Sequence, residues 1–297
     1  MNVIKYKNIF IVISFIAVAA SVVSIAYFGF NLGIDFTSGS LWQIKVLGSN
    51  PAEIRSFFYS ELETELSSVS YDKDNEIYTI SFAEITDETR QNMFSVIKEK
   101  FGDDVEDLDF WTISPTVSKE LTRKAILAIG FVLLAISLYI AFAFRKISKP
   151  ISSWKYGFIT LITLMHDVAI PAGLFAYLGY QFGASVDTNF IVALLVVMGF
   201  SVHDTIVVFD RVKENLTKTL GKKSLGDIIN TSIKETIHRS INTSATLILV
   251  LITLFFFGPS SLQFFILTIL VGTIIGTYSS IFLASPMLTF LEGKHKS

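Results

Sequence analysis

The sequence predicts an α-helical polytopic membrane protein, in which six transmembrane helices carry one α+β, ferredoxin-like domain outside the membrane. Three observations support this fold class. The 297 residues are 51% hydrophobic and only 17% charged, with a mean hydropathy of +0.56, a composition typical of membrane proteins. Six apolar runs are long enough to cross about 30 Å of hydrocarbon, which takes ~20 helical residues. Between the first two runs, residues 31–120 alternate the patterns of strands and helices.

The apolar runs and the basic residues set the predicted topology. The predicted spans are 9–30, 125–144, 156–180, 189–209, 240–257 and 264–290. The segment 17-AVAAS-21 resembles a signal-peptidase site, but the apolar run continues to Phe30, so we expect an uncleaved anchor. Lys and Arg gather before the first span, in alternate connections and after the last span, and are absent from 180–188 and 258–263. The positive-inside rule then places both termini in the cytoplasm.

This topology divides the chain into three expected parts. Residues 1–30 form the N-terminal cytoplasmic end and the first transmembrane helix, 31–120 the extracytoplasmic domain, and 121–297 a bundle of five transmembrane helices. The extracytoplasmic domain must fold on its apolar core alone, because the chain contains no cysteine. The same absence excludes thiolate metal sites and cysteine nucleophiles.

Charge is distributed unevenly along the chain. Residues 31–124 contain 18 Asp and Glu against 9 Lys and Arg, whereas the remainder contains 8 acidic and 15 basic residues. A solvated acidic exterior beside basic loops at anionic lipids accounts for this division. The pattern does not favour nucleic-acid binding, which calls for a basic surface.

The extracytoplasmic domain begins with a predicted strand and helix. Residues 40–48 alternate apolar and polar side chains, as a half-buried strand does. The following helix is predicted to begin at Pro51, with Asn50 as its N-cap and Glu53 completing a capping box.

A hairpin, a second helix and a last strand are predicted to complete the domain. The hairpin turns across residues 73–75, the helix starts at Thr86 with acids in its first turn and stops at Gly102, and the strand covers 108–114. The resulting order, β-α-β-β-α-β, is that of a ferredoxin-like layer. The domain contains no His, no phosphate-binding loop and no nucleophile beside a base, so we expect a binding or lever role and no enzymatic activity.

Four ionisable residues lie inside predicted spans, namely His166 and Asp167 in the third and His203 and Asp204 in the fourth. Such a residue costs about 2.5 to 3.5 kcal/mol in mid-membrane unless it faces the bundle interior, water or a partner. A carboxylate placed between an apolar environment and a cation can bind and release a proton as its surroundings change. These residues are therefore candidates for a proton relay.

A structural role competes with the relay, because a membrane Asp can also join helices through Ser or Thr hydroxyls. The relay is favoured for Asp204, whereas both roles stay open for His166, Asp167 and His203. The cation candidate is Arg239, because the uncharged run that follows it, 241–257, spans only about 25 Å. The side chain of Arg239 can then reach toward the level of Asp204 or extend to lipid phosphates, and both possibilities stay open.

Two further patterns predict how helices pack. Residues 224–237 place apolar side chains near one face, which predicts an amphipathic helix in the cytoplasmic interface. These side chains are Leu225, Ile228, Ile229, Ile233 and Ile237. In the last span, small residues recur at every fourth position and predict close helix contact. They are Gly272, Gly276, Ser280 and Ala284.

Two motifs make the chain resemble the SecF branch of the SecD/SecF family, within the RND superfamily. The first motif is GIDFTSGS, residues 33–40, directly after the first span, and the second is GFSVHDTIVVFDRVKEN in the fourth span. The resemblance covers essentially the whole chain. It gives Gly33, Asp35, Phe36 and Gly39 as family-motif residues. Ser38 departs from the family pattern, which has glycine there.

The resemblance implies a function in bacterial protein export. It implies an accessory subunit that pairs with SecD beside the SecYEG channel and uses the proton gradient to draw preproteins across the cytoplasmic membrane after the SecA-driven step. SecA and YajC are further implied partners, and the proton is the coupling ion, with no other cofactor and no metal. The family's essential carboxylate falls on Asp204 and its partner arginine on Arg239, and His203 stands where Asn is common.

Two other functions fit the same features. The chain could be a half-unit of an RND-type small-molecule exporter, since such exporters carry twice this set of spans and exterior domains in one chain. It could also be a structural membrane scaffold without a proton path, in which Asp204 joins helices.

Overall fold

The computed structural model describes residues 2–72, 75–145, 151–219 and 223–291. The chain divides into two compact units. Met1–Gly29, Leu127–Tyr177 and Asn189–Ser297 make up the helical unit, and Phe30–Ile126 with Leu178–Thr188 make up the α/β unit. The α/β unit thus contains the connection at 178–188 as well as the segment after the first span.

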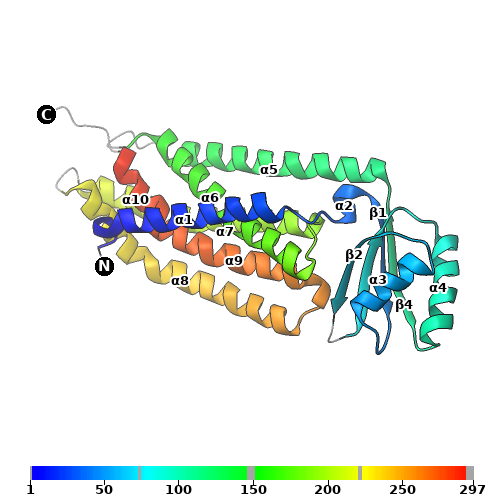
Figure 1. Cartoon of the computed structure of the whole chain (residues 1–297). Helices are drawn as coiled ribbons and strands as arrows, with labels where there is room; N and C mark the ends of the chain where they lie inside the picture. The colour runs from blue at the N-terminus through cyan, green and yellow to red at the C-terminus, as the bar shows by residue number, and fades with distance from the viewer. Residues whose placement is uncertain (1, 73–74, 146–150, 220–222, 292–297) are drawn as a thin grey trace. The chain divides into compact units, whose positions relative to one another are not determined.

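Six helices are long and apolar enough to cross a membrane within the described residues, as the sequence predicts (Figure 1). They are α1 (Lys7–Phe28, after the short η1, Ile4–Tyr6), α5 (Pro115–Ala143), α6 (Ser153–Phe182), α7 (Thr188–Thr219), α8 (Leu225–Phe257) and α9 (Gln263–Ser279, after η2, Ser260–Leu262). A π-helical segment, η3 (Ser280–Ala284), continues α9 into α10 (Ser285–Met287) and η4 (Leu288–Leu291). Short π-helical segments of this kind are frequent at functional sites.

The amphipathic segment at 224–237 is helical, and its residues form the first turns of the continuous α8, capped by Ser224. Its place in the cytoplasmic interface of a membrane stays a prediction. Its apolar side chains Leu225, Ile229 and Ile233 are at most 3% exposed and belong to the core of the helical unit. An apolar stripe packs equally well on lipid and on protein, and here it packs on protein.

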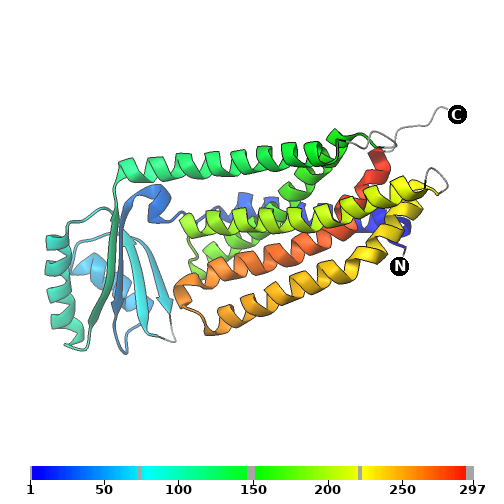
Figure 2. The ribbon, with the colours of Figure 1, turned by 180° about the vertical axis from the view of Figure 1, so that it is seen from behind.

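Helices α7 and α9 approach each other closely through the predicted small residues. A Cβ added to Gly272 would lie 2.2 Å from Cγ2 of Val197, and one added to Gly276 would lie 3.0 Å from Cβ of Ser201. Figure 2 shows the two helices side by side, with α8 next to α9. The prediction of close packing is confirmed for these two glycines. The other two small residues, Ser280 and Ala284, lie in η3.

The α/β unit has the predicted ferredoxin-like layer. Its strands are β1 (Gly39–Lys45), β2 (Leu66–Asp72), β3 (Ile77–Phe82) and β4 (Glu106–Ile113), and its main helices are α3 (Pro51–Ser60) and α4 (Asp87–Phe101). The sheet order is β2-β3-β1-β4, and every neighbouring pair is antiparallel. Both helices cover one face, because the buried Trp42 contacts Phe58 of α3 and Phe94 of α4.

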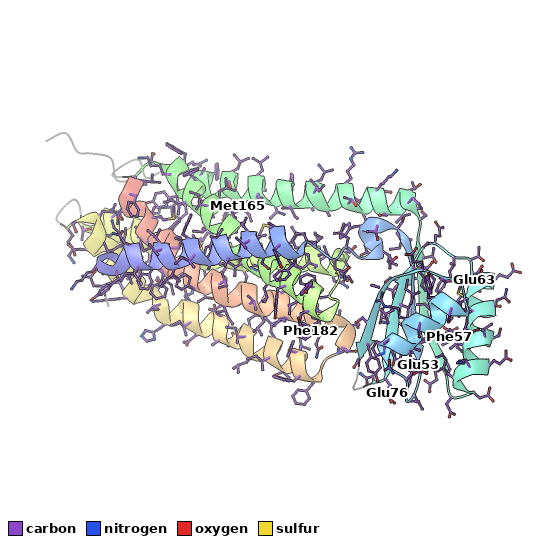
Figure 3. All side chains as sticks on the ribbon, in the orientation of Figure 1. Glu53, Phe57, Glu63, Glu76, Met165 and Phe182 are labelled. Atoms are coloured by element: carbon purple, nitrogen blue, oxygen red, sulfur yellow. The ribbon has the colours of Figure 1, made fainter. Side chains whose placement is uncertain are left out.

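Local signals in the sequence set the ends of these helices. Asn50 accepts a hydrogen bond from the N–H of Glu53 at 2.9 Å, Thr86 accepts one from the N–H of Thr89 at 3.2 Å, and α4 ends before Gly102. Phe57 points into the core, whereas Glu53 lies at the surface (Figure 3). The predicted cap at Asn50 is therefore confirmed, and Thr86, which was predicted to start its helix, is the N-cap of α4. The predicted hairpin turn lies at 73–75, of which residues 73 and 74 fall outside the described residues.

Candidate functional site

The carboxylate of Asp204 lies in the interior of the helical unit. It projects from α7 and is only 2% exposed. Ser244 of α8 donates a hydrogen bond to Oδ2 of Asp204 at 3.3 Å, and the hydroxyls of Ser244 and Thr277 of α9 lie 2.6 Å apart. Three helices thus meet at this acid, and hydroxyl groups surround it instead of lipid-facing apolar side chains.

His203 lies beside this acid but on another face of α7. Its side chain is 55% exposed, and its Nδ1 lies 3.7 Å from Oδ1 of Asp204. Consecutive residues point about 100° apart around a helix, so the imidazole reaches the surface of the unit while the carboxylate stays inside. The pair therefore connects an interior acid with the outer face of α7.

A second buried acid, Asp167, lies where α6, α7 and α9 meet. Nδ1 of His166 is 2.7 Å from Oδ1 of Asp167, and Ser279 of α9 donates to Oδ2 at 2.6 Å. Ser201 of α7 donates to the same oxygen. Asp167 is 0% exposed and His166 6%, whereas the neighbouring Met165 points outward (Figure 3).

Arg239 does not meet Asp204. Its side chain is exposed on α8, and no ion pair or hydrogen bond joins it to Asp204 among the described residues. Ser240 and Ser244, one helical turn apart, are among the α8 residues that face the interior. Arg239 lies one residue away from that face.

The hydroxyl partners of the two acids were not predicted from the sequence. Ser201 precedes Asp204 by three positions, so it lies on nearly the same face of α7. Thr277 and Ser279 follow Gly276, the residue at which α9 comes close to α7. A hydroxyl next to a close-packing glycine, on a helix predicted to touch the acid-bearing helix, is the signal that could have found them.

The residues of the first motif form a compact contact with the 178–188 connection inside the α/β unit. The N–H of Gly33 donates to the carbonyl of Val186 at 2.8 Å, and the N–H of Val186 donates to the carbonyl of Asn31 at 2.7 Å. Asp35 and Phe36 lie in a short helix, α2 (Ile34–Thr37). Oδ2 of Asp35 accepts hydrogen bonds from the N–H and the hydroxyl of Thr188, at 2.7 and 2.5 Å.

This arrangement makes Asp35 a helix cap, since Thr188 is the first residue of α7. We expect Asp35→Ala to weaken the first turn of α7 by about 1 kcal/mol, which speeds its amide hydrogen exchange about five-fold. The variant Asp35→Asn keeps an acceptor oxygen and serves as the matched control. Exchange measured by mass spectrometry on the full chain tests this, and equal exchange at 188–192 in the wild type and Asp35→Ala would contradict the capping role.

The end of the first motif requires unusual backbone geometry. Gly39 has φ +126°, and an added Cβ would lie 2.5 Å from the carbonyl oxygen of Phe82, so only glycine fits. Ser38, where the resemblance leads us to expect glycine, has φ +63° and ψ 167°. This region of backbone space is essentially restricted to glycine.

Ser38→Gly is therefore expected to stabilise the protein. Relief of backbone strain outweighs the extra freedom of glycine in the unfolded chain, with a net gain of about 1 kcal/mol in the free energy of unfolding. Thermal unfolding of the full chain in detergent measures the change. The opposite substitution, Gly39→Ala, should lower the midpoint, and an unchanged or lower midpoint for Ser38→Gly would count against strain at this position.

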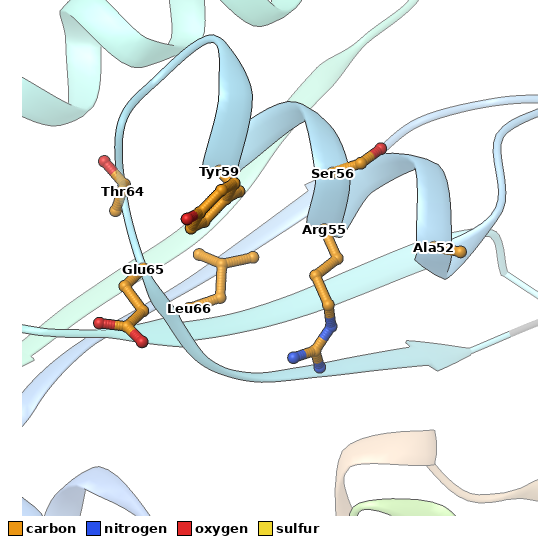
Figure 4. Close-up of a pocket in the computed structure, with 7 residues that line it drawn as sticks. All are labelled: Ala52, Arg55, Ser56, Tyr59, Thr64, Glu65 and Leu66. Carbon is orange, nitrogen blue, oxygen red and sulfur yellow. The ribbon is translucent and has the colours of Figure 1, made fainter.

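The α/β unit also has a hollow of about 430 Å³ between α3 and β2 (Figure 4). It is lined by Ala52, Arg55, Ser56, Tyr59, Thr64, Glu65 and Leu66. Arg55 and Glu65 bring one charge of each sign, without a nucleophile and base at hydrogen-bonding distance. Across the described residues, no three His, Asp or Glu side chains gather in a way that could hold a metal ion.

Comparison with known proteins places these features in a family. The profile described as "Protein export membrane protein SecD/SecF, C-terminal" matches residues 93–294, and the "SecD/SecF GG Motif" matches residues 23–46. The protein translocase subunit SecF of Thermobaculum terrenum is 36% identical, over 99% of this chain and 95% of its own length. That of Desulfurispirillum indicum is 37% identical, over 98% and 91%.

Longer proteins contain a region similar to the whole chain. The protein translocase subunit SecDF of Bacillus subtilis is 32% identical over 98% of this chain, which spans 38% of that protein. The crystal structure of SecDF from Thermus thermophilus, described as a translocon-associated membrane protein, matches with a TM-score of 0.86 at 28% identity. The match covers 98% of this chain and 38% of that one. A SecDF structure in a super-membrane-facing form matches with a TM-score of 0.68.

Proposed function

This chain belongs to the SecD/SecF family of protein-export membrane proteins, and from that membership we propose that it works with SecD to couple the proton gradient to preprotein export. SecD forms the other half of a heterodimer in this proposal. The SecDF proteins support the pairing, because this chain matches only 38% of the Bacillus subtilis protein, whose name joins both subunits. The SecYEG channel is the site of action, SecA and YajC are further partners, and both termini face the cytoplasm.

The observation that carries the proposal is the burial of Asp204 in an apolar helix. An acid in this position is costly unless it has partners, and here Ser244 and His203 provide them. An ionised carboxylate only accepts hydrogen bonds, whereas a protonated one also donates. Proton binding at Asp204 therefore changes which hydrogen bonds the Ser244–Thr277 pair can make, and with them the contact between α7, α8 and α9.

His203 and Arg239 have separate roles in this proposal. His203 takes a proton at the outer face of α7 and passes it from Nδ1 to Oδ1 of Asp204. Arg239 is a mobile counter-ion, whose long side chain moves from the surface toward the deprotonated carboxylate. The α/β unit converts the resulting change in helix packing into a pull on the emerging preprotein.

Copurification and transport together test the proposed function. Purified from native membranes in mild detergent, the chain should bring SecD and SecYEG with it. Membrane vesicles depleted of the chain should lose the part of preprotein export that a protonophore abolishes, and regain it when the chain is restored. Recovery of the chain without SecD, or export that responds to the gradient equally in depleted vesicles, would refute the proposal.

A structural scaffold is the second candidate, because hydroxyl groups from neighbouring helices hold both acids. In that function, the chain keeps its partners assembled and the gradient acts elsewhere. The scaffold predicts that depletion lowers export with and without a protonophore by the same factor. The proton-coupled function predicts that only the gradient-dependent part is lost.

His203→Asn is expected to change the pH dependence of gradient-driven export. Imidazole is the side chain whose charge ordinarily changes between about pH 5 and 8, and Asn keeps a hydrogen-bonding group of similar size. The variant should therefore lose the part of the pH profile that falls in this range. Export rates in vesicles at stepped pH measure it, and superimposable profiles would remove His203 from the relay.

A further inference from the structure

Five buried polar side-chain atoms of the helical unit have no hydrogen-bond partner in the part of the chain that the structure describes, on Ser14, Tyr156, His166, Ser240 and Thr273. Two of them, Nε2 of His166 and Oγ of Ser14, lie on the neighbouring helices α6 and α1. His166 is 6% exposed and Ser14 3%. A buried polar group without a partner is destabilising, and the effect is strongest in the hydrocarbon of a membrane. Each atom therefore needs a polar partner at that place.

Helices α1 and α6 run parallel and keep a common register. The hydroxyl of Ser24 donates to the carbonyl of Gly173 at 2.7 Å, and four residues further along each helix the rings of Phe28 and Tyr177 lie 5.6 Å apart. Ser21 of α1 lies close to Gly173 of α6, because a Cβ added to Gly173 would lie 2.4 Å from Cβ of Ser21. The two helices are thus in direct contact at this level.

Ser14 and His166 occupy equivalent positions along α1 and α6. Each precedes the close Ser21–Gly173 contact by seven residues, which is about two helical turns. Two turns return a side chain to nearly the same face of its helix. This spacing places both unpartnered atoms on the side of their helix that carries the Ser21–Gly173 contact.

Contacts made by two neighbouring residues of helix α9 support the same alignment of α1 and α6. The hydroxyl of Tyr278 donates to the carbonyl of Phe10 at 3.1 Å, one turn before Ser14 on α1. The next residue, Ser279, donates to Asp167. Ser279 is also the last residue before η3, whose π-helical turns offer a second arrangement of backbone hydrogen bonds.

We propose that His166 and Asp167 form a second proton-binding centre, connected to α1 by one internal water held between Nε2 of His166 and Oγ of Ser14. A water molecule in a protein interior typically makes two to four hydrogen bonds, and these two atoms supply the first two. The proposal rests on the proton relay proposed above and adds to it a second site and a path through α1.

The proton moves through this centre without a net change in the charge of the imidazole, which passes from its Nδ1–H to its Nε2–H tautomer. In the resting state, Nδ1 of His166 carries the proton and donates it to the ionised Asp167, while Nε2 accepts from the water. A proton arriving from the water at Nε2 forms an imidazolium, which releases its Nδ1 proton to Oδ1 of Asp167 across 2.7 Å. The imidazole is then neutral again, and the carboxyl group is uncharged.

The surrounding helices bring few other titratable groups to this centre. Helix α7 carries His203 and Asp204, which contact each other, and Asp204 also accepts a hydrogen bond from Ser244. Tyr278 of α9 is bonded to the backbone of α1. Lys7, the one Lys, Arg, Asp, Glu or His in α1, donates to Thr289. The charge state of the centre is thus set mainly by His166 and Asp167 themselves.

Infrared difference spectroscopy on the full chain with SecD in proteoliposomes tests the proposal. A pH step should produce a carboxylic acid band that disappears in Asp167→Asn and persists in Asp204→Asn. Ser14→Ala removes one partner of the water and should slow the appearance of this band about five-fold, as expected for the loss of one hydrogen bond. Ser21→Ala is the matched control, because Ser21 is buried on the same helix and donates to the carbonyl of Ala17.

The outcomes separate this centre from the relay at Asp204. A pH step that leaves the Asp167 carboxyl ionised throughout overturns the proposal, and so does equal kinetics in Ser14→Ala and Ser21→Ala. His166→Gln keeps a hydrogen bond to Asp167 but cannot pass on a proton, so it should slow the appearance of the carboxylic acid band. This second variant keeps the proposal testable if Asp167→Asn misfolds. If Asp204→Asn leaves export intact while the Asp167 band still titrates, the proposed function fails and the second centre stands.

Discussion

Asp204→Asn is expected to abolish the gradient-dependent part of preprotein export and to leave assembly with SecD intact. Asn has nearly the shape of Asp and can still accept the hydrogen bond from Ser244, but it cannot bind and release a proton. Export in vesicles that carry the variant should therefore fall to the rate that wild-type vesicles show with a protonophore.

Two controls make this result specific. Asp204→Glu keeps the titratable group and should retain part of the stimulation. Asp103→Asn removes an exposed acid of the α/β unit and should have no effect. Full stimulation in Asp204→Asn would favour the scaffold.

Gly272→Val is expected to have the largest effect on folding. Even a single added Cβ would lie 2.2 Å from a methyl group of Val197, so α7 and α9 must separate or their side chains must leave their preferred rotamers. Overpacking of this kind costs about 1 to 3 kcal/mol, and sometimes more. The variant should unfold at a lower temperature in detergent and accumulate poorly in membranes.

The chain offers a matched control and a rescue for this substitution. Gly199 lies on α7 with no atom within 4 Å of an added Cβ, so Gly199→Ala should be tolerated. Val197→Ala removes the colliding methyl groups and should restore part of the stability of Gly272→Val. If Gly199→Ala and Gly272→Val unfold alike, close packing at Gly272 is not what holds α7 and α9 together.

Features that depend on neighbours in the sequence were predicted well. Asn50 caps its helix as expected and the second helix starts within one residue of Thr86, because a cap satisfies N–H groups only two or three residues away. The six spans were found from unbroken apolar runs. Their ends were less accurate, because α7 continues with polar residues to Thr219, well past the apolar run that defines its span.

Features that depend on which helices meet were not predictable in the same way. The apolar stripe at 224–237 carries no information on whether lipid or protein covers it, and in the structure its residues Leu225, Ile229 and Ile233 pack in the core of the helical unit. The hydroxyls of Ser201 and Ser279 come from different helices to one acid, and Asp35 caps a helix 153 residues away. Partnerships of this kind follow from tertiary packing and not from local pattern.

Proton flux is the measurement that tests the central claim most directly. Proteoliposomes that contain the chain with SecD, and a pH-sensitive dye inside, should acidify when an inward proton gradient is imposed. The account predicts that Asp204→Asn abolishes this flux and that Asp103→Asn leaves it unchanged. Equal proton flux in the wild type and Asp204→Asn would contradict the account.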